Sequence, residues 1–204
     1  MRLCLSIGCK TSTSLNSSKR IVPFAFTTTK ETLFELVKGE IKMFLEDNNE
    51  IRKELFQTID GLTDEQFNKK PSNEGWSPKQ IFEHLVRMET VIATNIAREL
   101  KNPESPKSMK KPIALSTNRL IKVEAPGYTV PTEDYKLKLE MKKELHDSRL
   151  FLLDVYESST KEVFREKSFK HPIFGHVPLI QWFPFVGLHE KRHLKQLKKT
   201  IEML

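Results

Sequence analysis

Apolar residues recur at intervals of three and four along most of the chain beyond residue 30, which predicts long amphipathic helices. The first stripe runs from Leu33 to Ile59 and stops before Gly61. A second begins after Ser77-Pro78-Lys79-Gln80, where serine can cap the helix, proline can take its first position and glutamine can reach back. A helix is therefore expected from about Pro78 to Leu100, with a stripe of Ile81, Leu85, Met88, Ile92 and Ile96.

Two further helices are expected in the second half of the chain. One starts near Thr132 and runs through Tyr156, and the last runs from about Pro178 to the end of the chain, with a kink at Pro184. Residues 101–131 carry five prolines and predict a long crossover loop, and residues 160–177 are also expected to be loop. Four long helices with long connections and no repeat of fixed length predict an all-α fold, a four-helix bundle.

Composition supports one helical domain and sets the N-terminus apart. The chain has 204 residues, of which 38% are hydrophobic and 30% charged, with only 7 glycines. Residues 1–29 are basic and rich in serine and threonine, and the first acidic residue is Glu31. This segment is predicted to be a disordered extension or a cleaved one, such as a transit segment. Residues 30–204 are predicted to be the bundle domain. The only cysteines, Cys4 and Cys9, lie in the extension, so a cytoplasmic protein without a disulfide framework is expected.

The positive net charge of the chain does not by itself indicate a particular class of binding partner. The formal net charge is +7, yet lysine and arginine alternate with aspartate and glutamate along most of the helices, which is typical of solvated helix faces. No basic stretch interleaved with aromatic residues appears, so nucleic acid is not the expected partner. No apolar run approaches the roughly 20 residues that a membrane span needs.

Candidate chemistry is concentrated in His189-Glu190-Lys191-Arg192-His193, within a chain that has 6 histidines. Residues four apart lie one above the other on a helix, so both imidazoles can bind one metal ion. The pattern H-E-x-x-H is used by zinc peptidases, with the glutamate as general base. Such enzymes need a further ligand downstream, but Glu202 is the only later carboxylate, and Gln196 and Lys199 stand where a metzincin has glycine and histidine.

A third ligand is therefore expected from upstream, and His84 is the candidate. It lies on the apolar face of its helix, where a single histidine is more often a core residue than a ligand. Three inward histidines with open positions for water are typical of a catalytic zinc-type site. Glu190 lies about 100° around the helix from His189, so either a solvated or arginine-paired carboxylate or a base beside the site fits. Gln196 shares the face of His193 and could bind a ligand or pair within the bundle.

The other aromatic and histidine residues have less defined roles at this level. Trp182 and Trp76 are expected to pack, Trp182 in the core and Trp76 in a loop. His171 and His176 flank a loop containing proline and glycine that could border the cleft, and His146 is expected on the surface. His171 and Trp182 are the weaker candidates for substrate contact, as Glu190 and Gln196 are for catalysis.

Three segments together resemble the DinB/YfiT-like family. They are Gly75 to Leu85 (GWSPKQIFEHL), His171 to Gly175 (HPIFG), and Gln181 to Gln196, which contains both His189 and His193. The resemblance covers the chain from about residue 30 and implies an up-down-down-up four-helix bundle. It also implies a divalent metal, commonly zinc or nickel, on one histidine of the second helix and two of the last, which correspond to His84, His189 and His193.

The resemblance further implies a class of reaction. Relatives include thiol S-transferases that use bacillithiol, mycothiol or glutathione, and other members have been described as metal-dependent hydrolases. The expected function is a metal-dependent S-transferase in which a low-molecular-weight thiol attacks a small electrophilic substrate, with no catalytic cysteine needed in the protein. A non-catalytic, stress-associated metal-binding protein and a hydrolase that uses metal-bound water are the alternatives. Relatives often form dimers, so a homodimer is also expected.

Overall fold

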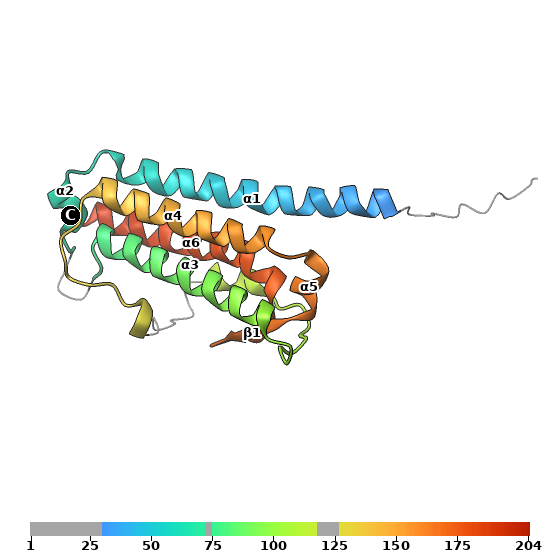
Figure 1. The fold of residues 1–204 in the computed structure, drawn as a ribbon. Helices are drawn as coiled ribbons and strands as arrows, with labels where there is room; N and C mark the ends of the chain where they lie inside the picture. The colour runs from blue at the N-terminus through green and yellow to red at the C-terminus, as the bar shows by residue number, and fades with distance from the viewer. Residues whose placement is uncertain (1–29, 72–74, 118–126) are drawn as a thin grey trace, which may run out of the picture.

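The computed structural model describes the chain at residues 30–71, 75–117 and 127–204, and its side chains from residue 45 onward. The predicted N-terminal extension, residues 1–29, lies outside this range. Four long helices form the bundle: α1 (Lys30–Asp60), α3 (Pro78–Lys101), α4 (Lys138–Glu157) and α6 (Leu179–Glu202). The N-terminal part of α1 extends past the other three helices (Figure 1). Within the described residues, no helix is both long and apolar enough to cross a membrane.

The four helices follow the expected up-down-down-up connectivity. The helices α3 and α4 run in the same direction and pack along each other, and α1 and α6 run the opposite way as a second parallel pair (Figure 1). A parallel neighbour requires the chain to return along the whole bundle, which is what the long segment between α3 and α4 does. Two short 3₁₀ helices, η1 (Ile113–Thr117) and η2 (Gly127–Thr129), lie in this crossover.

The predicted start of α3 is confirmed as a capping box. The hydroxyl of Ser77 accepts a hydrogen bond from the Gln80 amide at 3.2 Å, and the Gln80 side chain accepts from the Ser77 amide at 3.0 Å. Thr63 and Gln66 make the same exchange at the start of the short helix α2 (Asp64–Asn68). Each exchange satisfies backbone donors that a helix N-terminus would otherwise leave without partners.

The third long helix starts later than predicted. It begins at Lys138, not near Thr132, because the preceding backbone is hydrogen-bonded to other parts of the protein. The Thr132 amide donates to Glu83 Oε2 at 3.1 Å, and the Lys136 amide donates to Asn68 Oδ1 at 3.1 Å. These tertiary bonds hold residues 132–137 in a non-helical conformation that no helical periodicity reveals.

Residues 160–177 are not simply loop, which corrects the prediction. They form the short helix α5 (Lys161–Glu166), capped by Thr160, and most of a hairpin of β1 (Ser168–His171) and β2 (Gly175–Pro178). The strands pair antiparallel, with His171 opposite Gly175. Gly175 has φ 66°, in the left-handed region that favours glycine, so it can close this short turn without strain.

The core consists of two apolar clusters within the bundle. One joins the N-terminal half of α6 with α5, the hairpin and the C-terminal half of α3, and the other joins the opposite halves of α3 and α6 with α1, α2 and α4. The predicted stripe of α3 is buried at Ile81, Leu85, Ile92 and Ile96, and α6 continues through Pro184 as one helix.

Candidate metal centre

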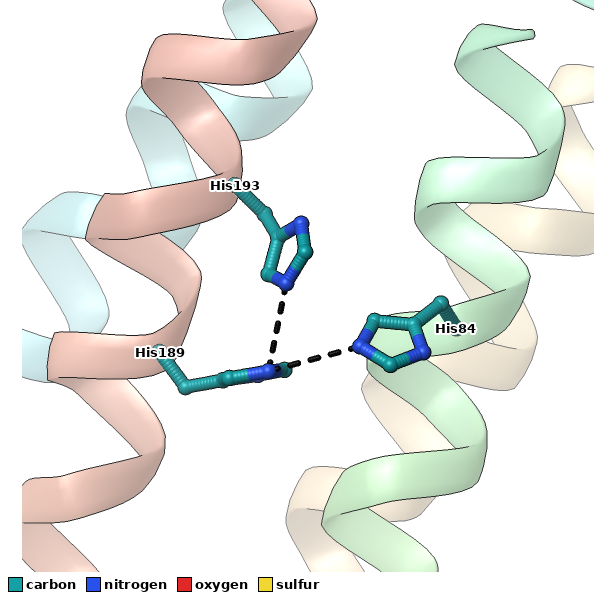
Figure 2. Close-up of side chains that lie close together, drawn as sticks. All are labelled: His84, His189 and His193. Carbon is teal, nitrogen blue, oxygen red and sulfur yellow. Dashed lines mark hydrogen bonds between the residues drawn. The ribbon is translucent and has the colours of Figure 1, made fainter. Parts of the chain in front are cut away.

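Three histidines from two helices meet at one side of the bundle. His84 comes from the first half of α3, and His189 and His193 lie one helical turn apart on α6, on the side that faces α3 (Figure 2). His84 and His193 are buried, whereas His189 is partly exposed. The inward direction predicted for His84 is what brings it to the other two.

The ring nitrogens of these histidines lie close enough to bind one ion. Their candidate ligand atoms all lie within 4.8 Å of one another. Nε2 of His189 is 3.4 Å from Nε2 of His84 and 3.2 Å from Nε2 of His193, and the three rings converge on one point (Figure 2). Among the described residues, this is the one group of histidine, cysteine or acidic side chains with metal-binding geometry.

The outer ring nitrogens are held by oxygen atoms, which determines where the protons lie. Nδ1 of His84 is 2.9 Å from the backbone oxygen of Thr129, and Nδ1 of His193 is 3.0 Å from Gln196 Oε1. A carbonyl oxygen only accepts, so both Nδ1 atoms carry the proton in the neutral rings. Both Nε2 atoms therefore present lone pairs toward Nε2 of His189, an arrangement that suits a bound cation. Gln196 thus orients a ring rather than pointing into the site.

Burial favours the neutral form of His84 and His189. It lowers the pKa of His84, although the hydrogen bond to Thr129 acts in the opposite direction. It also lowers the pKa of His189 well below its usual value, and the neighbouring His193 and His84 add to that effect. Neutral imidazoles are the form that binds metal ions, so His84 and His189 are in their ligand form near neutral pH.

Aromatic rings form walls on two sides of the cluster. The indole of Trp76 lies 5.0 Å from the ring of His84 and 6.4 Å from that of His193, measured between centroids. Phe185, one turn before His189 on α6, lies 6.1 Å from the ring of His189. Trp76 was predicted to be only a loop anchor, but its position before the capped start of α3 also places it on the histidines.

Glu190 points away from the histidines, into the core. It is 1% exposed, and its carboxylate accepts hydrogen bonds from Arg52 on α1 and Arg149 on α4. Glu89 on α3 binds the same two arginines, at 2.8 Å from Arg52 Nη2, and Ser148 donates to Glu89 at 2.6 Å. Of the two roles left open for Glu190 as a flanking carboxylate, the structure gives the arginine-paired one.

This cluster of Arg52, Glu89, Arg149 and Glu190, called here the buried charge cluster, joins all four helices between the two apolar clusters. Although burial opposes ionisation, the charges of Arg52 and Arg149 hold the pKa of Glu89 below its usual value. Sequence reasoning missed three of its members. A signal was available: Glu89 interrupts the stripe between Leu85 and Ile92, a position where an unpaired charge would be costly.

The remaining candidates lie around the hairpin. Trp182 is buried, as predicted, with its ring stacked 4.0 Å from that of Phe169 and its indole donating to the Val177 oxygen at 3.2 Å. His171 ends β1 and is partly buried, with its ring 5.6 Å from that of Trp182. His176 lies on β2 beside Ser168, and His146 is exposed on α4, away from the cluster.

Sequence comparison agrees with the family suggested by the motifs. The profile of the DinB superfamily matches residues 49–197, which include α3, α4, the C-terminal part of α1, most of α6 and the three histidines. The chain belongs to the DinB superfamily. It is also 33% identical over 156 residues to YuaE, an uncharacterized protein of Bacillus subtilis (strain 168), a match that spans 76% of this chain and 96% of YuaE.

A solved structure supports the DinB-type fold. YfiT of Bacillus subtilis, described as a probable metal-dependent hydrolase with an unusual four-helix bundle topology, superposes with a TM-score of 0.53 at 15% sequence identity. The match covers 84% of this chain and 87% of YfiT. At this identity the likeness shows the shared bundle architecture.

Proposed function

We propose that the protein is a metal-dependent enzyme that holds a divalent ion, zinc or nickel, on His84, His189 and His193. The observation that carries the proposal is the convergence of three imidazoles, two of which, His84 and His193, have their outer nitrogens held by Thr129 and Gln196. Three protein ligands leave further coordination positions open, as catalytic sites do. The description of YfiT as a probable metal-dependent hydrolase is consistent with a metal in this fold.

The reaction we favour is transfer of a low-molecular-weight thiol, such as bacillithiol, to an electrophilic small molecule. A divalent ion at such a site lowers the pKa of a thiol or water that binds it, which strengthens the nucleophile at neutral pH. The protein's residues provide binding and shielding: the imidazoles hold the ion, and Trp76 and Phe185 cover the histidine rings. Because the thiol carries its own sulfur, no cysteine of the protein is required.

The orientation of Glu190 distinguishes this proposal from the peptidase interpretation. A zinc peptidase needs the glutamate of H-E-x-x-H beside the metal as a general base. Here that carboxylate is paired with Arg52 and Arg149 on the other side of α6. Among the described residues no carboxylate joins the histidine cluster, so a reaction whose nucleophile arrives as an easily deprotonated thiol fits best.

Two measurements test the proposal in order. Protein prepared without a histidine tag is incubated with Zn²⁺ or Ni²⁺ and desalted, and about one equivalent of metal per chain is expected to remain. The loaded protein is then given bacillithiol, glutathione or dithiothreitol with monochlorobimane. In the expected reaction a carbon–sulfur bond forms, chloride leaves and the thiol proton passes to solvent, giving a fluorescent conjugate.

The same preparation separates the alternatives. Cleavage of p-nitrophenyl acetate without thiol transfer would favour the hydrolase, and metal retention without either reaction would favour a non-catalytic metal-binding protein. Failure to retain metal would contradict all three. A homodimer, a cytoplasmic location and the lack of a nucleic-acid partner remain predictions of the sequence.

A further inference from the structure

His171, at the end of β1, lies one aromatic ring away from the histidine cluster. Its ring centroid is 4.8 Å from that of Phe174, 5.6 Å from that of Trp182 and 5.2 Å from that of Phe185. Phe185 in turn contacts the ring of His189, at 6.1 Å. His171 is also close enough to contribute to the lowered pKa of His189. The hairpin therefore brings a fourth imidazole beside the centre without making it a ligand.

The turn of the hairpin fixes the proton of this imidazole. Nδ1 of His171 accepts hydrogen bonds from the backbone amides of Ile173, at 3.0 Å, and Phe174, at 3.3 Å. A nitrogen that accepts cannot also carry a proton, so the neutral ring has its proton on Nε2. Burial lowers the pKa of His171 to about 4, which keeps the ring neutral at physiological pH. The ring is thus held as an Nε2–H donor.

Neither this donor nor a second one nearby is used within the described part of the protein. No described group accepts from Nε2 of His171, and none accepts from the indole nitrogen of Trp76. Trp76 contacts His84 and His193, whereas His171 approaches from the side of His189. His171 and Trp76 thus lie on different sides of the histidine cluster, and each has an N–H group that no described group accepts.

We infer that His171 is a substrate-binding residue, which donates its Nε2–H to a carboxylate oxygen of a flat small molecule that reacts at His84, His189 and His193. The inference rests on the proposed function and names the class of its electrophilic substrate. A hydrogen bond from an N–H donor to an ionised carboxylate is about twice as strong as one to a neutral acceptor, which favours an anionic partner for this donor. Phe185 and Trp76 offer ring faces to a planar apolar group, as walls of small-molecule sites commonly do.

Two substitutions separate the two nitrogens of His171. In His171→Asn the amide oxygen takes the place of Nδ1 and keeps the acceptor for the turn, but the Nε2–H donor is lost. In His171→Gln the amide nitrogen reaches the level of Nε2 and restores a donor. The probe is benzoate, which combines a flat ring with a carboxylate. It is titrated into Co²⁺-loaded protein, where the visible spectrum of the ion reports binding.

His171→Asn is expected to weaken benzoate binding about tenfold, as is typical when a hydrogen bond to a charged acceptor is lost. His171→Gln should recover most of that loss. Both variants should bind Co²⁺ as the wild-type protein does. Equal benzoate affinity of the wild-type protein and His171→Asn, or no benzoate binding by the wild type, would overturn the inference.

The proposed function can fail separately from this inference. If the wild-type protein retains no Co²⁺, the metal site is wrong, and the same benzoate titration is followed on metal-free protein through the ¹⁵N-coupled signals of His171. A benzoate-dependent shift that disappears in His171→Asn would still support the donor role. An Nδ1–H tautomer of His171 in the wild-type spectrum would overturn it whatever the metal content.

Discussion

Arg52 and Glu190 form a buried ion pair between α1 and α6, with Nε of Arg52 donating to Oε1 of Glu190 at 2.7 Å. The pair lies on the side of α6 that faces away from His189 and His193. One helical turn therefore presents its histidines to the candidate metal centre and its glutamate to the core. An experiment can distinguish a role of Glu190 in stability from a role in catalysis.

Glu190→Gln is expected to lower the free energy of unfolding by about 3–5 kcal/mol, because one partner of a buried pair is removed while Arg52 and Arg149 stay in place. Urea denaturation measures this change. Glu54→Gln is the matched control: it breaks the exposed pair with Lys198, which should cost only about 0–1 kcal/mol. A Glu190→Gln variant with unchanged stability but no turnover would instead make Glu190 a catalytic group.

His84→Ala should weaken metal binding by more than about 100-fold, because one of three ligands is removed. Competition with a chromophoric chelator measures the affinity. His146→Ala, on the exposed face of α4, is the control and should bind metal like the wild-type protein. The thermal stabilisation that metal gives the wild type should also disappear in His84→Ala. Equal affinity of His84→Ala and His146→Ala would exclude His84 as a ligand.

Gly187→Ala should destabilise the packing of α1 against α6. A Cβ atom at this position would meet Asn48 Oδ1 at 1.8 Å and Asn48 Cγ at 2.6 Å. Asn48 cannot move freely, since it is buried and its Nδ2 donates to the Phe183 oxygen at 3.0 Å. Crowding of this kind costs about 1–3 kcal/mol.

The effect of Gly187→Ala is tested by comparing urea midpoints. Gly61→Ala is the control, because a Cβ atom there meets nothing within 4 Å. Adding Asn48→Ala to Gly187→Ala should recover part of the loss by removing the clash. A Gly187→Ala protein as stable as the wild type would mean that the two helices lie farther apart than described.

The stability of the protein should fall as the pH is lowered from about 6.5 to about 4, in part because of His171. Burial lowers its pKa to about 4, whereas an unfolded histidine titrates near 6.5. Between these values the unfolded chain binds a proton that the folded protein does not, so acidification favours unfolding. The contribution is fully present above pH 6.5 and is lost by about pH 4.

His171→Asn removes this titration but keeps the turn acceptor. Its stability should therefore decline less over the same pH range, whatever the loss of ring packing costs at pH 7. Urea midpoints measured across that range give the comparison. Parallel pH profiles of the two proteins would contradict a depressed pKa at His171.

The local pattern of the sequence indicated the four long helices and the three candidate ligands. The Ser77 capping box and the stripe beginning at Ile81 fixed the start and the inward face of α3, because they depend only on neighbours along one helix. The spacing of His189 and His193 likewise fixed one face of α6. The apolar face of α3 and the lack of a suitable downstream ligand made His84 the third candidate, and the motif resemblance implied the same three histidines and the connectivity.

Only the tertiary structure decided which groups surround these histidines. The backbone oxygen of Thr129 binds His84 across 45 residues, and no periodicity marks a carbonyl in a crossover segment. The hairpin that brings His171 near His189 looked like loop, because each strand is only 4 residues long and forms by pairing with the other. Glu190 could be placed on a flank of α6 from the sequence, but only its arginine partners on α1 and α4 show that the flank is buried. Helix periodicity is local, whereas the partner of a buried charge is set by how the helices pack.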